Sequence, residues 1–87
     1  MERTYRGEYF LNFESSTLTP ESGGAPLCVR SPQLAERLES QGATVRAHVI
    51  VRGRLSEQGR YCNLGAYKRL LTVTEILDVS DVRARDD

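Results

Sequence analysis

The stretch from Thr44 to Val79 constrains the fold of this chain more than any other. Every second residue from Val45 to Val51 is apolar, and the residues between them are polar except for Ile50. This period is typical of a strand with one buried face and one wet face. A segment rich in Gly and Tyr follows, and a second apolar run extends from Leu70 to Val79. The sequence therefore predicts two strands, joined by a turn-rich loop, as the frame of the protein.

The N-terminal half predicts further β structure. Tyr5 to Glu14 alternates in the same way, with Tyr5, Gly7, Tyr9, Leu11 and Phe13 on one face. Gly7 inside this strand favours a bend or sharp coiling. Residues 15–26 are rich in turn-forming residues and predict a mobile loop, with Leu18 as a short strand continuation. Leu27 to Val29 predicts a brief strand.

One helix is indicated after this brief strand. Ser31 suits the N-cap and Pro32 the first helical turn. Leu34, Ala35 and Leu38 share one face. Gly42 is a natural C-cap, which predicts a helix of about ten residues that plugs a barrel end or covers a sheet face.

The last strand carries an irregular pattern. Leu71 and Val73 alternate with threonines, but Ile76 lies on the opposite parity. A bulge near Thr74–Glu75, or burial of both faces, would reconcile the two. Residues 80–87 are charged and predict a frayed tail.

Together these elements predict one domain over residues 1–87, mainly β with one short helix. A coiled first strand and a helix inserted midway are typical of a small OB-like β-barrel. The alternative is an α+β arrangement, an antiparallel sheet covered by the helix.

The segment from Val49 to Val79 resembles a family of small uncharacterised bacterial OB-fold-like proteins, some of them lipoproteins. Its pattern is a Gly-x-Tyr-x-x-Leu-Gly-Ala-Tyr turn, here Gly59 to Tyr67, followed by a Val-Thr strand. The Tyr-x-Gly-x-Tyr that begins at Tyr5, with Phe-Glu after it, is similar to the family's first strand. The match covers about half of the chain. Cys62 and Asn63 stand where the pattern has Gly and His, so a site built on that His does not transfer. The family has no assigned activity, so the resemblance implies fold and not function.

The charge is unevenly distributed although the formal net charge is +0. Residues 46–69 contain six Lys or Arg against one Glu, Glu57. No secretory segment follows Met1 and no run is long enough for a membrane span, so we expect a cytoplasmic protein with reduced thiols. The alternative is an exported protein whose signal peptide has been removed, in which Cys28 and Cys62 form a bridge.

The Gly–Tyr segment allows two interpretations. In the architectural one, Gly59 and Gly65 permit positive φ while Tyr61 and Tyr67 pack over a barrel end. In the functional one, the tyrosines stack bases and the nearby cations bind phosphates of single-stranded nucleic acid. The near-neutral net charge counts against a dedicated nucleic-acid binder. The candidate binding surface is Arg46, His48, Arg52, Arg54, Arg60, Tyr61, Tyr67, Lys68 and Arg69.

The sequence gives little indication of a catalytic site or a metal site. His48 is the single histidine and has no second ligand at a recognisable spacing. The two cysteines form no CxxC pair. The sequence therefore predicts a non-enzymatic binding or interaction module with no cofactor. Its alternatives are a single-stranded nucleic-acid binder and an accessory domain of an envelope protein. We expect a protein partner, with nucleic acid as the alternative, and a monomer or homodimer.

Overall fold

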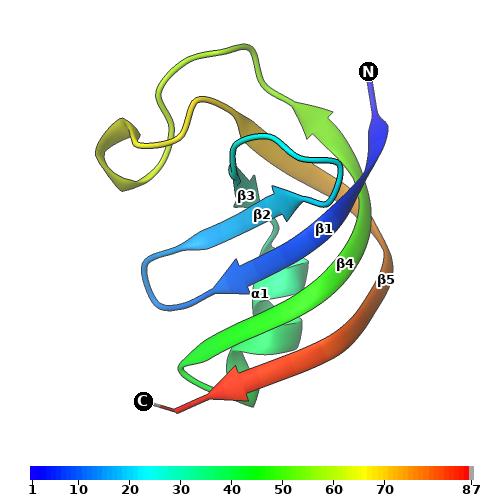
Figure 1. The fold of residues 1–87 in the computed structure, drawn as a ribbon, viewed down its shortest axis with the longest axis vertical. Coiled ribbons are helices and arrows are strands. Elements are labelled where there is room, and N and C mark those ends of the chain that lie inside the picture. Colours follow the sequence, from blue (N-terminus) through cyan, green and yellow to red (C-terminus); the bar gives the residue numbers. More distant parts are fainter. Residues whose placement is uncertain (87) are drawn as a thin grey trace.

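The computed structural model describes residues 1–86 and contains five strands and one α-helix (Figure 1). The elements are β1 (Arg3–Leu11), β2 (Ser16–Pro20), β3 (Leu27–Arg30), α1 (Pro32–Leu38), β4 (Thr44–Leu55) and β5 (Leu70–Arg85), with short 3-10 turns at Glu39–Gln41 and Asn63–Gly65.

The strands close into a barrel in the order β1-β2-β3-β5-β4. All neighbours are antiparallel except β3 and β5, which pair in parallel through Cys28↔Leu70 to Arg30↔Thr72. The helix lies between β3 and β4 in the chain, behind the lower half of the strands in Figure 1. This arrangement confirms the predicted mainly β barrel with one short helix, and it is compatible with a small OB-like fold. Closure of the ring excludes the alternative of an open sheet covered by the helix.

The core lies inside the barrel and receives side chains from all five strands. Alternation along β4 works as predicted, because Val45, Ala47, Val49 and Val51 are all buried. Tyr9 of β1 is fully buried, and its hydroxyl lies 2.6 Å from Ser16 Oγ. Burial raises the pKa of this phenol, so the hydroxyl stays neutral and can hydrogen-bond inside the barrel wall.

Three register shifts interrupt the pairing of β5 with β4. At these shifts Thr74, Leu77 and the pair Asp81–Val82 of β5 have no direct partner in β4, and Ala47 of β4 has none in β5. Asp81 has a φ of 52°. The first shift confirms the predicted bulge near Thr74. Each extra residue changes which side chains face the core, which explains why Ile76 packs against the core although its parity differs from that of Leu71.

Beyond the third bulge β5 continues to Arg85, which pairs with Thr44. The predicted frayed tail over residues 80–87 is therefore wrong as far as Arg85. The backbone of this charged segment pairs with the start of β4, and this pairing supplies protein hydrogen-bond partners that a frayed tail would not have. Asp87 lies outside the described residues.

The predicted loop over residues 15–26 is wrong for Ser16–Pro20, which forms the whole strand β2 and not only a short continuation at Leu18. Thr17 and Leu18 are buried, and β2 pairs with both β1 and β3. The turn-forming composition of β2 gives no strand signal, because this strand is stabilised by pairing with its two neighbours, β1 and β3. Gly7 of β1 sits where a Cβ would collide with the Thr19 carbonyl, so this glycine allows the close approach of β2 and not a bulge.

The first strand ends at Leu11, three residues earlier than predicted. The Asn12 side-chain oxygen accepts the backbone N–H groups of Glu14 at 3.0 Å and Ser15 at 2.7 Å, which turns the chain. Phe13, predicted to share the inward face of the strand, is instead 94% exposed at the tip of this turn.

The helix begins as predicted, with Ser31 Oγ accepting the N–H of Leu34 at 3.2 Å. Leu34 and Leu38 are buried in the core. The α-helical part ends at Leu38 and continues as a 3-10 turn, so it is shorter than expected. Gly42 does not adopt the left-handed C-cap conformation, since its φ is 169°. A Cβ there would lie 2.8 Å from the Arg85 carbonyl, so Gly42 is where the chain passes close to the end of β5.

Candidate ligand-binding site

The long loop between β4 and β5, residues 56–69, is held together by backbone hydrogen bonds. Gly59 N–H donates to the Lys68 carbonyl at 2.9 Å. Tyr61 and Tyr67 exchange two hydrogen bonds of 2.8 and 3.1 Å and form an isolated bridge. This pairing brings the two sides of the loop together, and the loop projects from the barrel on the same side as the 12–15 turn (Figure 1).

The tip of this loop is strained and tied down. Cys62, Asn63, Leu64 and Gly65 have φ values of 55°, 27°, 60° and 81°, a run of positive values that non-glycine residues rarely adopt. Strain of this kind persists only where the surroundings impose it. Two ties impose it here. Cys62 forms a disulfide with Cys28 of β3, with 6.4 Å between the Cα atoms, and Asn63 Nδ2 donates to Ser15 Oγ at 3.1 Å.

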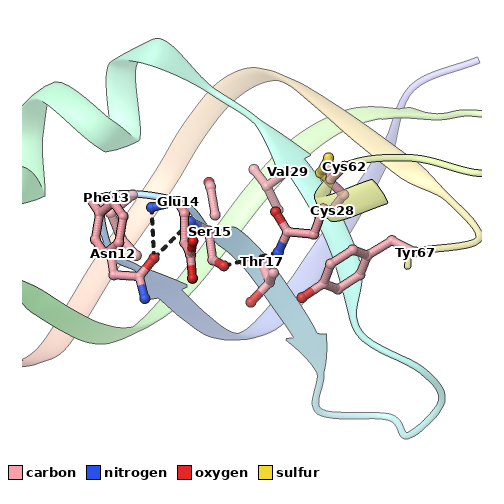
Figure 2. Close-up of a pocket in the computed structure, with 12 residues that line it drawn as sticks. Asn12, Phe13, Glu14, Ser15, Thr17, Cys28, Val29, Cys62 and Tyr67 are labelled. Atoms are coloured by element: carbon pink, nitrogen blue, oxygen red, sulfur yellow. Dashed lines mark hydrogen bonds between the residues drawn. A yellow bond between two sulfur atoms is a disulfide. The ribbon is translucent and has the colours of Figure 1, made fainter. Parts of the chain in front are cut away.

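These ties close a pocket of about 230 Å³ between the loop tip, β3 and the 12–15 turn. Figure 2 shows the disulfide and Tyr67 at one end, and Asn12 and Phe13 at the other. A second pocket, of about 470 Å³, lies between the turn and the region after the helix, and is lined by Ala35, Glu39 and Ala43. Leu11, Asn12 and Phe13 line both pockets. We call the two pockets together the Phe13 groove.

The polar groups of the Phe13 groove are almost all uncharged. The Tyr67 hydroxyl and the Asn12 amide nitrogen make no hydrogen bond within residues 1–86 and are available to a ligand. The carboxylates of Glu14 and Glu39 are the charged side chains in the lining, and no Lys, Arg or His contributes to it. The groove therefore offers neutral hydrogen-bonding groups, an exposed aromatic ring and a weakly negative potential.

Most of the cations predicted as a binding surface lie elsewhere. Arg46, His48 and Arg52 project from the outer face of β4, where each meets an acid. Arg46 is 3.3 Å from Glu8 and lies 4.7 Å from the centroid of the Phe10 ring. The remaining contacts are His48 with Glu21 at 3.0 Å and Arg52 with Glu2 at 3.9 Å. These pairs neutralise much of the local positive charge that the sequence shows.

The other predicted residues belong to the 56–69 loop and its flanks. Arg69 donates to the Ser56 carbonyl at 3.0 Å, and the Tyr61 hydroxyl donates to the Glu57 carbonyl at 3.0 Å. Within residues 1–86, Arg54, Arg60 and Lys68 are exposed and form no ion pair. Of the nine residues, only Tyr67 lines the Phe13 groove.

Glu8 is the centre of the ionic network on the outer face, because Arg83 also reaches it at 2.6 Å. The hydrogen bond from Arg83 and the charge of Arg46 lower the pKa of Glu8 below 4.5. Its stabilising effect should thus be complete above pH 4.5 and disappear as the pH falls through the lowered value. We expect Glu8→Gln to reduce the free energy of unfolding at neutral pH by at most about 1 kcal/mol, since the pair is solvent-exposed.

Urea unfolding at neutral and acidic pH measures this effect. The difference between Glu8→Gln and the wild type should vanish in acid and shrink at high salt. A difference that persists under both conditions would mean that the substitution perturbs packing and not the ionic network.

Sequence reasoning overlooked the residues of the 12–15 turn because the strand pattern was extended through them. The available signal was Asn12 with Ser15 and Ser16 three and four residues after it, which is typical of a side-chain-capped turn.

Within residues 1–86, no group of three His, Cys, Asp or Glu side chains could hold a metal ion. None of the helices in that part of the chain has the length and apolar character needed to cross a membrane. No family model, curated protein or solved structure gives a significant match to this chain.

Proposed function

We propose that this protein is a non-enzymatic binding module that holds its ligand in the Phe13 groove. The observation that carries the proposal is the pocket between the loop tip and the 12–15 turn. Its walls are fixed before any ligand arrives, by the Cys28–Cys62 disulfide and by the hydrogen bond from Asn63 to Ser15. Fixed walls reduce the ordering cost of binding.

The position of the groove supports the same proposal. Its smaller pocket lies over β3 and one end of β2, beside the β1–β2 and β4–β5 loops, which by analogy of fold is the face that OB-fold barrels use for linear ligands.

Single-stranded nucleic acid on the basic strand β4 is the second candidate function. Exposed Arg54, Arg60 and Lys68 favour it, since cations without acidic partners attract phosphates. The ion pairs of Arg46 and Arg52 weaken it, because a phosphate would have to displace Glu8 and Glu2.

The disulfide supports placing the protein in an oxidising compartment, as an exported or envelope-associated module, in place of the cytoplasmic location first expected. An intracellular module with the same two thiols reduced is the alternative.

An NMR fragment screen tests the binding site without knowledge of the ligand. We expect a mixture of small neutral and anionic fragments to shift amides of residues 12–15, 62–63 and Tyr67. Arg52→Glu should leave these shifts unchanged. Shifts confined to residues 46–54, and lost in Arg52→Glu, would overturn the groove and favour nucleic acid.

A further inference from the structure

Building on the proposed function, we infer that the ligand of the Phe13 groove is an uncharged oligosaccharide, with the Phe13 ring as the platform for a sugar unit. Four features of the groove support this assignment: its charge, its exposed aromatic ring, its free polar groups and its two pockets that share Phe13.

OB-fold barrels bind two kinds of linear polymer on this face, oligonucleotides and oligosaccharides. The charge of the groove distinguishes between them. A single-stranded nucleic acid brings one negative charge per nucleotide and needs cations to hold it. The lining supplies none, and the carboxylates of Glu14 in one pocket and Glu39 in the other would repel phosphates. A neutral oligosaccharide meets no such penalty.

The Phe13 ring, which lines both pockets of the groove, does not pack in the hydrophobic core. Phe13 is 94% exposed, whereas the other phenylalanine, Phe10, is half-buried beneath Arg46. Exposing a phenyl ring costs hydrophobic free energy that burial would recover. One face of a sugar ring consists of C–H groups, and such a face recovers that free energy by packing flat on the phenyl ring.

The polar groups around the ring suit sugar hydroxyls, which both donate and accept hydrogen bonds. The Tyr67 hydroxyl can do both, and the Asn12 amide nitrogen is a free donor, because its oxygen is occupied by the turn. In Figure 2 the Tyr67 hydroxyl points into the pocket and the Phe13 ring lies at its far end. These neutral groups fix orientation without requiring a counter-charge.

The form of the groove indicates a chain of sugars and not one unit. Phe13 lines both pockets, of about 230 and 470 Å³, so a ligand longer than one sugar unit can cover the ring and also reach into a pocket. Single ring platforms with a pocket on each side suit a linear polymer.

The test is a set of separate NMR titrations of the oxidised protein with chitohexaose, maltohexaose and cellohexaose. We expect at least one to give saturable shifts at Phe13, Asn63 and Tyr67, with an affinity that is the same at low and high salt. Phe13→Ala should weaken that affinity about tenfold. Phe10→Ala, the matched control on the outer face, should leave it unchanged.

Each other outcome overturns the inference. If no hexasaccharide binds, or if Phe10→Ala and Phe13→Ala have equal effects, the groove is not a sugar site. If a hexathymidylate or a degenerate hexapeptide pool shifts the groove and no sugar does, the ligand is a nucleic acid or a peptide. The proposed function would survive in that last case, because fragments would still bind the groove; it fails separately if they do not.

Discussion

Replacing both Cys28 and Cys62 with serine is expected to lower the free energy of unfolding by about 3–4 kcal/mol. The disulfide joins residues 34 apart in the sequence, and a cross-link over a loop of that length removes a corresponding entropy from the unfolded chain. The loss should appear in urea unfolding of the oxidised wild type against the double variant. It would be a large part of the stability of a domain of this size.

The same substitution should also release the strained tip of the 56–69 loop. With the covalent tie gone, only the hydrogen bond from Asn63 to Ser15 holds the tip to the rest of the groove. Fragment binding in the groove should therefore weaken together with stability. Wild type treated with a thiol reductant is the matched control, and it should match the double variant in both measurements. A loss below about 1 kcal/mol in the variant would contradict a stabilising role for the bridge.

Replacing Leu71 with alanine is expected to cost about 2–5 kcal/mol, the usual range for a buried leucine. Leu71 is fully buried at the start of β5, where the parallel and antiparallel neighbours of the strand meet. Leu77→Ala in the same strand is the matched control. Its side chain is 47% exposed, so it should cost less than about 1 kcal/mol.

This pair of variants also tests the bulges of β5. In an uninterrupted strand Leu71 and Leu77 lie on the same face, since they are an even number of residues apart. The bulges at Thr74 and Leu77 break that relation and bring Ile76 and Val79 toward the core. Equal losses in the two leucine variants, measured by urea unfolding, would contradict the observed register.

Alternation of apolar and polar residues in the sequence reveals a strand only when the strand has several residues on each face. β4 has twelve residues and a regular buried series, so its period is visible in the sequence. β2 has five residues, of which Thr17 and Leu18 are adjacent and both buried, so no alternation exists to detect. Its stability comes from pairing with β1 and β3, which local composition does not encode.

The candidate site was poorly predictable for a related reason. The Phe13 groove is assembled from a turn after β1, from β3 and from a loop that precedes β5, and Tyr67 is its one residue that belonged to the predicted binding surface. The basic surface seemed promising because Arg46 and Arg52 are close in sequence to other cations. Their partners Glu8 and Glu2 lie some forty or more residues away, so the neutralisation is invisible until β1 and β4 are paired.

Local sequence patterns left a closed barrel and an open sheet as alternatives. They predicted the mainly β class, the inserted helix, the inward face of β4 and the cap at Ser31. All of these depend on side-chain period, capping or chain stiffness, which act over a few residues. The folded protein adds β2, the extension of β5 to Arg85, the exposure of Phe13 and the choice of a Cys28–Cys62 bridge over two free thiols. Each of these depends on which distant segments become neighbours, and that is settled by closure of the barrel as a whole.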